Sequence, residues 1–240
     1  AMCKDTSGNY YTVRSLYSGN YFGEITKYDS SGVQQWTTRI NTGTMSRLND
    51  VAYNSTDGYL YCVGAYNDGS YKQLITRLTP STGAVQASRS YRYTSGSDEF
   101  AMGLAIDSSG NVYTHGYSYG FSGSKYDLTI NKWDTSFQLS WQKKITPGTN
   151  QYPYASHYPI IDNSGNFVGC AYYTFGSYVK QFIYSVSSTG TLNWQQYISG
   201  TSTNDYPYAL AKDASGNIYM AGNATELLLS KFNSSGTLQW

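Results

Sequence analysis

One glycine-containing phrase recurs five times along the chain, and its spacing limits the fold more than any other feature. The phrases read DTSGNYY, NSTDGYLY, DSSGNVY, DNSGNFV and DASGNIY, with glycines at Gly8, Gly58, Gly110, Gly165 and Gly216. Successive glycines lie 50, 52, 55 and 51 residues apart. This period is typical of solenoids and propellers, whose repeats bury apolar surface only against their neighbours.

A second turn follows the first in every repeat and completes a four-strand pattern. The second turns read DSSGVQQW, PSTGAVQA, DTSFQLSW, SSTGTLNW and NSSGTLQW. Tryptophan holds one position in four of them, at Trp36, Trp141, Trp194 and Trp240, and Ala87 holds it in the second copy. Short apolar runs on both sides of each turn predict four strands per repeat.

Repeated antiparallel meanders of this length predict an all-β chain that forms a five-bladed β-propeller. We expect one domain, 1–240, with blades at about 1–36, 49–91, 100–144, 155–197 and 208–240. The chain opens on the first strand of a repeat and ends on the fourth. We therefore expect no strand shared between the termini, and a ring closed by packing of the last blade on the first.

The phrase DxSGNxY, followed by an apolar segment and the turn KxD/N-SSG-xxxW, resembles the SBBP-type bacterial β-propeller repeat. The resemblance covers nearly the whole chain. That family is named for seven blades, whereas the phrases here predict five. The resemblance implies a bacterial or viral protein placed outside the cell, at a cell surface or at a virion surface. It transfers no catalytic residues.

Composition excludes several classes of function. The chain has 27 tyrosines and 24 glycines, and only 13% of its residues are charged, which is typical of a turn-rich β protein. A formal charge of +1 predicts no nucleic-acid partner, and the absence of a run of about 18 to 20 apolar residues predicts no membrane insertion. Cys3, Cys62 and Cys170 have unrelated spacings, so we interpret them as buried free thiols.

The repeated aspartates and tryptophans have a structural interpretation. An aspartate before a glycine turn accepts backbone N–H groups two or three residues ahead, and we assign this role to Asp5, Asp107, Asp162 and Asp213, with Asn54 replacing them in the second copy. We expect the tryptophans to pack between blades. The two histidines, His115 and His157, are interpreted as hydrogen-bonded core or rim residues, so we expect neither a metal nor a cofactor.

Antiparallel strands place the repeated turns at one end of the blades and the variable connections at the other. The variable connections, for example GYSYGFSGSKY and SGTSTNDYPY, are rich in Tyr, Ser, Gly and Asn, a composition typical of recognition surfaces. The candidate ligand-binding residues are Tyr17, Tyr21, Asp98, Tyr117, Tyr119, Tyr152, Tyr154, Tyr178, Asp205, Tyr206 and Tyr208. The tyrosines of QYPY and DYPY have an alternative role in filling the seams between blades.

Three functions remain open from the sequence. The first is a non-catalytic recognition module that binds carbohydrate or another cell-surface ligand. The second is a structural module of a fibre, capsid or adhesin with a protein partner. The third is a glycoside hydrolase that uses channel carboxylates, since we interpret Asp50, Asp98 and Asp205 as recurring at one phase, just before the first strand of a repeat.

Overall fold

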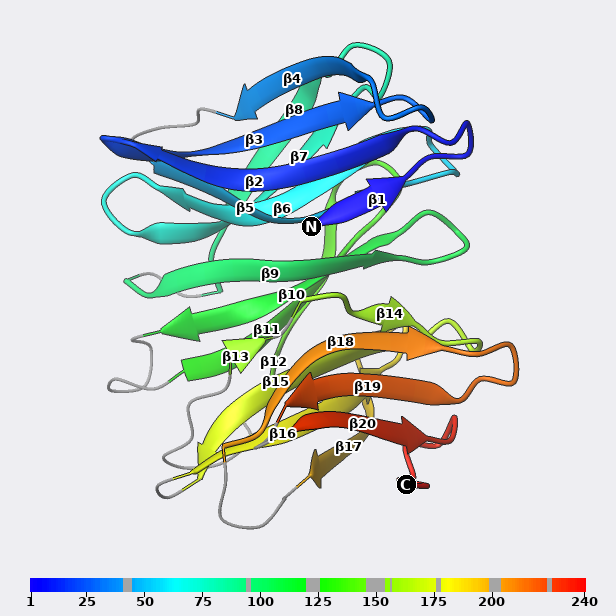
Figure 1. Ribbon diagram of the computed structural model, residues 1–240. Coiled ribbons are helices and arrows are strands. Elements are labelled where there is room, and N and C mark those ends of the chain that lie inside the picture. The colour runs from blue at the N-terminus through cyan, green and yellow to red at the C-terminus, as the bar shows by residue number, and fades with distance from the viewer. Residues whose placement is uncertain are drawn as a thin grey trace.

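The computed structural model describes nine stretches of the chain: 1–40, 45–93, 96–119, 126–145, 154–155, 157–175, 178–198, 204–223 and 226–240. In this part the regular elements are all β-strands, arranged in five antiparallel sheets. The sheets follow one another in chain order from the N-terminal sheet to the C-terminal sheet (Figure 1). No helix of the described residues has the length and hydrophobicity of a membrane span.

The first three sheets have the same four-strand order. The first contains β1 (Met2–Lys4), β2 (Tyr10–Ser18), β3 (Asn20–Tyr28) and β4 (Gln34–Ile40); the second contains β5 (Met45–Tyr53), β6 (Leu60–Asn67), β7 (Tyr71–Leu78) and β8 (Val85–Tyr91); the third contains β9 (Asp98–Ile106), β10 (Val112–Tyr119), β11 (Tyr126–Trp133) and β12 (Leu139–Ile145). Strands adjacent in sequence pair with each other, as the meander pattern predicts.

The fourth sheet differs because its innermost strand is interrupted. It contains β13 (Tyr154–Ala155), β14 (Ile160–Ile161), β15 (Phe167–Phe175), β16 (Tyr178–Val186) and β17 (Leu192–Ile198), and both β13 and β14 pair with β15. Between them Tyr158 has a positive φ of 59°, and Pro159 has no N–H to donate to the ladder. This interruption moves His157 out of the regular pairing.

The fifth sheet has three strands, β18 (Tyr206–Lys212), β19 (Ile218–Asn223) and β20 (Leu227–Phe232). A fourth strand ending at Trp240 was expected, but the residues after Gly236 form only one bridge, between Phe232 and Leu238. Backbone hydrogen bonds from Lys231 to Trp240 and from Gln239 to Lys231 hold this short segment against β20.

Neighbouring sheets pack face to face, and each of the four seams contains one apolar cluster. The first seam buries Tyr11 and Ile25 against Leu48, and the last buries Ile183 against Met220. The two middle seams have clusters of the same kind. No strand of the first sheet packs extensively on a strand of the fifth among the described residues, so the expected closing seam is not observed.

Three tryptophans lie where a sheet meets the next one, as predicted. The indole Nε1 of Trp36 donates to the Pro80 carbonyl at 3.1 Å, and that of Trp141 donates to the Ser188 carbonyl at 3.0 Å. A Cβ added at Gly83 would lie 2.7 Å from the Trp36 ring, and one at Gly236 would lie 2.4 Å from the ring of Trp194. The turn glycine of one sheet thus makes room for the tryptophan of the sheet before it.

The seam between the second and third sheets has the opposite arrangement. Ala87 stands at the tryptophan position, and Phe137 stands at the glycine position of the next turn with φ 61°. The Phe137 ring is 1% exposed and lies 5.7 Å from both Tyr61 and Trp133. An aromatic ring from the third sheet therefore fills the seam that lacks a tryptophan in the second.

The aspartates of the first turns have the predicted capping role. Asp107 Oδ1 accepts the N–H groups of Ser109 at 3.0 Å and Asn111 at 2.9 Å, and its Oδ2 accepts from the Asn111 side chain and from the Tyr113 hydroxyl. The same pattern is present at Asp5 and Asp213, and at Asp162 without the tyrosine hydroxyl, since Val168 stands at that position. Because these carboxylates are occupied by their own turns, they are structural.

Candidate functional site

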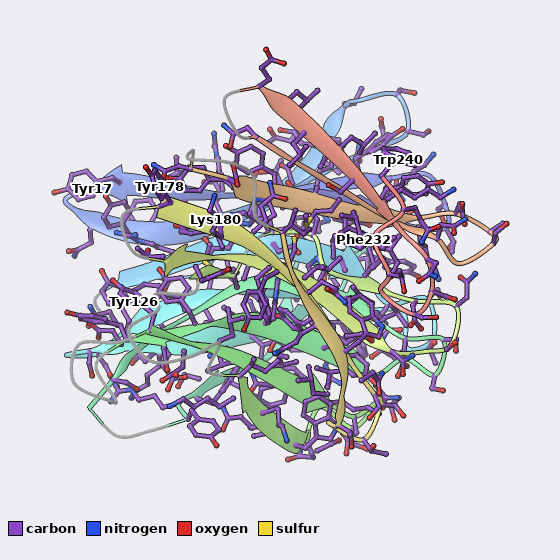
Figure 2. The ribbon with its side chains drawn as sticks, turned by 90° about the horizontal axis from the view of Figure 1, so that it is seen from below. Tyr17, Tyr126, Tyr178, Lys180, Phe232 and Trp240 are labelled. Carbon is purple, nitrogen blue, oxygen red and sulfur yellow. The ribbon has the colours of Figure 1, made fainter. Side chains whose placement is uncertain are left out.

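The two ends of the sheets differ in the way the sequence predicts. We call the end with the repeated turns, such as 5–9 and 107–111, the turn end, and the end with the β2–β3 and β6–β7 hairpins and the connections between sheets the loop end. Figure 2 shows Tyr17, Tyr126 and Tyr178 at the loop end and Phe232 and Trp240 at the opposite side.

A cavity of about 370 Å³ lies at the loop end among the inner strands of the third, fourth and fifth sheets. The described residues that line it are Met102, Tyr117, Ala155, His157, Tyr172, Tyr206, Pro207 and Tyr208. We call it the tyrosine pocket. Four tyrosines, one histidine and no carboxylate make up its polar groups, and its volume is within the range of small-molecule sites.

Each wall of the tyrosine pocket is held by a regular element. Tyr117 is in β10 opposite Phe100 of β9, and Tyr172 is in β15 opposite Tyr154 of β13. Tyr206 begins β18, and its ring meets that of Tyr172 edge to face with centroids 5.1 Å apart. The tyrosines are therefore positioned by three different sheets.

Burial changes the ionisation of the pocket residues. It raises the pKa of Tyr117 to about 12, with further contributions from Tyr126 and Tyr172, and it also raises the pKa of Tyr172. Burial and the N-terminal ammonium lower the pKa of His157, and hydrogen bonds with the backbone of Met102 and Asn49 oppose that shift. At neutral pH the hydroxyl groups of Tyr117 and Tyr172 and the imidazole of His157 are thus neutral.

Three of the predicted ligand-binding residues, Tyr117, Tyr206 and Tyr208, come together in this pocket. Sequence reasoning missed Tyr172, His157 and Met102 as lining residues. Tyr172 belongs to the variable segment YYTFGSY, so its composition was a usable signal, whereas the contribution of His157 depends on the interruption between β13 and β14.

The other predicted residues lie elsewhere at the loop end. The rings of Tyr17 and Tyr21 contact each other at a tilt across the β2–β3 hairpin with centroids 4.9 Å apart. Tyr119 meets Tyr126 in the same way at 4.7 Å, and Tyr178 lies beside the Lys180 ammonium. Tyr152 lies outside the described residues. Only the backbone of Tyr154, in β13, is described.

The carboxylates considered for hydrolysis do not share one structural phase. Asp50 lies inside β5, 8 residues before Gly58, whereas Asp98 begins β9, 12 residues before Gly110, and Asp205 precedes β18, 11 residues before Gly216. Asp50 accepts the N–H groups of Val51 at 2.9 Å and Leu104 at 3.0 Å, and its burial raises its pKa to about 6. It links the second sheet to the third.

The two other acids are also engaged. Asp98 accepts the backbone N–H of Tyr71 at 2.8 Å, and the buried Asp205 pairs with Lys180 at 3.3 Å. No group of three metal-ligating side chains is found within the part of the chain that the structure describes.

His115 and the three cysteines lie outside the tyrosine pocket, in packing positions. His115 is fully buried and its Nδ1 lies 3.0 Å from the Tyr184 hydroxyl, which confirms its interpretation as a hydrogen-bonded core residue. All three cysteines are free thiols, but Cys3 is only half-buried because it lies in the short inner strand β1.

A second, larger cavity of about 630 Å³ lies at the turn end of the seam between the third and fourth sheets. It is lined by Ile106, Pro159 and Lys212 together with turn residues such as Asp162, whose carboxylate already caps its own turn. Its described lining residues include no aromatic side chain, and their titratable groups are Lys212 and the turn aspartate Asp162. The tyrosine pocket is the better candidate because its polar groups converge.

Comparison with known proteins supports the repeat architecture. Residues 193–228 match the family model described as the SBBP β-propeller repeat. No curated protein matches the chain. The matched residues run from β17 into β20, so they cross from the fourth sheet into the fifth.

Solved propeller structures superpose on nearly the whole chain at low sequence identity. A Dyadobacter fermentans protein of unknown function has a TM-score of 0.70 at 10% identity over 99% of this chain and 79% of its own. The Pseudomonas aeruginosa periplasmic gluconolactonase has a TM-score of 0.65 at 14% identity over 99% and 69%. The propeller domain of the trilobed protease from Pyrococcus furiosus, described as having an open velcro topology, has a TM-score of 0.54 at 12% identity over 97% and 65%.

These likenesses concern the fold. Together with the five antiparallel sheets and the repeated turns, they identify the chain as a β-propeller repeat protein that carries an SBBP-type repeat at residues 193–228.

Proposed function

We propose that the protein is a non-catalytic recognition module that binds carbohydrate in the tyrosine pocket, and that it works outside the cell, at a cell surface or on a virion. The observation that carries this proposal is the convergence of Tyr117, Tyr172, Tyr206 and Tyr208 on one cavity.

The chemistry of the pocket suits a sugar. Aromatic faces pack against the C–H faces of pyranose rings, and phenol hydroxyl groups exchange hydrogen bonds with sugar hydroxyl groups at small conformational cost. Tyr208 is 53% exposed and stands beside the half-buried Tyr206, so the pocket offers both an open and a sheltered ring. The neutral His157 adds a group that donates or accepts hydrogen bonds.

The lining of the pocket favours binding over hydrolysis. Glycoside hydrolysis in most families needs two carboxyl groups on either side of the scissile bond. The described lining residues supply none, and Asp50 and Asp205 are engaged with backbone amides or a lysine. The gluconolactonase resemblance concerns a protein named for a sugar lactone, which agrees with a sugar-sized cavity on this fold.

A glycan-array screen with three matched variants tests the proposal. Tyr206→Ala and Tyr117→Ala each remove a wall of the pocket, so we expect the array signal to fall at least tenfold for both. Tyr28→Ala removes a half-buried tyrosine at the turn end and serves as the control with unchanged binding. The proposal is wrong if no glycan binds the wild type, or if all three variants bind alike.

A second candidate function, assembly with another protein, rests on the fifth sheet. Leu227 is 86% exposed, Leu229 50% and Trp240 59%, although side chains at such positions in earlier sheets lie in seams. Exposed apolar groups of this kind mark association surfaces. Sedimentation velocity over a range of concentrations tests this role: Leu229→Lys should reduce self-association, and a concentration-independent monomer would argue against a role for this surface in self-association.

A further inference from the structure

Aromatic rings continue from the tyrosine pocket across the loop end. Tyr117 stacks on Phe100 with centroids 5.1 Å apart, and Phe100 lies 4.7 Å from Tyr71. The Arg47 guanidinium lies 5.9 Å from the Tyr71 ring and 4.1 Å from the Tyr21 ring. We call this set, from the first sheet to the third, the aromatic track; its members are Tyr17, Tyr21, Arg47, Tyr71, Phe100 and Tyr117.

Every side chain of the track keeps part of its surface exposed. Tyr17 is 69% exposed, and the other five are half-buried. A set of stacked rings used only for packing would be buried within a seam, as Phe137 is. The track instead forms a partly open strip that reaches the pocket at Tyr117, which belongs to both.

Arg47 places a positive charge within the track. Three lysines near this end pair with acids, Lys72 with Asp68, Lys144 with Asp127 and Lys180 with Asp205, and Arg92 donates to the Ser70 carbonyl and hydroxyl. Within the described stretches Arg47 belongs to no ion pair, and its buried Nε has no hydrogen-bond partner. Its charge also reaches the hydroxyl of Tyr117, where it favours the ionised form.

We propose that the tyrosine pocket and the aromatic track form one elongated site for an unbranched, acidic oligosaccharide, with a carboxylate of a uronic-acid unit bound by Arg47. This inference rests on the proposed function. A cavity of about 370 Å³ accommodates only a short part of such a chain, and the track supplies further rings for stacking. Arginine matches a carboxylate with two parallel N–H donors, and stacking on aromatic rings orients it for this contact.

Titration calorimetry with three defined ligands separates this inference from the proposed function. The ligands are hexagalacturonic acid, the galacturonic acid monomer and cellohexaose as the neutral hexamer. We expect the acidic hexamer to bind at least tenfold more tightly than its monomer and more tightly than the neutral hexamer. Its affinity should fall as salt is raised, because part of it is ionic.

Two variants assign the effect to the track. Tyr71→Ala should weaken the acidic hexamer at least fivefold more than it weakens the monomer. Arg47→Gln should bring the acidic hexamer down to the affinity of the neutral one. Tyr28→Ala again serves as the control at the turn end.

The outcomes distinguish the two proposals. Equal affinity for hexamer and monomer, or an unchanged preference for the acidic hexamer in Arg47→Gln, overturns the elongated acidic site and leaves sugar binding in the pocket intact. If none of the three ligands binds, this inference is overturned. The glycan array decides separately whether the pocket binds another sugar.

Discussion

The turn end and the loop end belong to the same strands, but the turn end repeats its contacts from sheet to sheet and the loop end does not. At the turn end, Asp5, Asp107, Asp162 and Asp213 make nearly the same hydrogen bonds, and successive tryptophans meet successive turn glycines. At the loop end the sheets share no such pattern, and aromatic side chains from three of them converge on the tyrosine pocket. The repeated residues of the turn end therefore stabilise the fold, whereas the variable residues of the loop end form the candidate site.

The largest expected effect on stability concerns the seam between the second and third sheets, where Phe137 replaces the turn glycine and Ala87 replaces the tryptophan. Replacing Phe137 with glycine removes a buried ring, which costs about 3 to 5 kcal/mol, and relieves about 1 kcal/mol of positive-φ strain. Ala87→Trp alone overpacks the seam and costs about 1 to 3 kcal/mol. The double variant restores the arrangement of the other seams, so urea unfolding should show a favourable coupling of about 2 kcal/mol. Strictly additive costs would show that the two positions do not fill the same space.

A smaller effect compares acids at the two ends. Asp107→Ala leaves the N–H groups of Ser109 and Asn111 without their acceptor and should lower the free energy of unfolding by about 1 to 2 kcal/mol. Asp68→Ala, at the loop end, removes only a partly exposed ion pair with Lys72 and should cost clearly less than Asp107→Ala. Equal costs in chemical denaturation would contradict the division between the ends.

The smallest effect is a pH dependence at the loop end. The pKa of His157 is lowered from 6.5 by burial, so below pH 6.5 the unfolded chain binds a proton that the folded protein still excludes. The stability that the neutral imidazole contributes is therefore complete above pH 6.5 and is lost as the pH falls through its lowered pKa. Melting temperatures between pH 7.5 and 5 should fall less steeply in His157→Gln than in the wild type. Parallel curves would show that His157 does not contribute to the pH dependence of stability.

The sequence predicted those parts of the molecule that depend on local chemistry. Asp107 and Gly110 define a turn through contacts within five residues, and Trp36 and Trp141 repeat at one position, so their roles could be inferred from spacing alone. The tyrosine pocket could be predicted only in part. Tyr117, Tyr206 and Tyr208 were recognisable by composition, but their meeting depends on how three sheets pack.

The misses have physical causes. His157 reaches the pocket because Tyr158 and Pro159 interrupt the inner strand, which is a tertiary feature of one repeat. The assumed phase of Asp50 and Asp98 was wrong because Asp50 lies 8 residues before its turn glycine and Asp98 lies 12, and a β-bulge is common to β5 and β9. A closing seam between the first and fifth sheets was expected from the number and order of the repeats, which contain no information on how strongly each sheet is rotated against the next.

An amide chemical-shift titration with the ligand selected by the glycan array tests the central claim most directly. The account predicts that the shifts concentrate at the loop end, at Tyr117, Tyr172 and Tyr206, and that the repeated turns around Asp107 and Asp213 stay unchanged. Shifts centred on those turns, or on the exposed side chains of the fifth sheet, would contradict it.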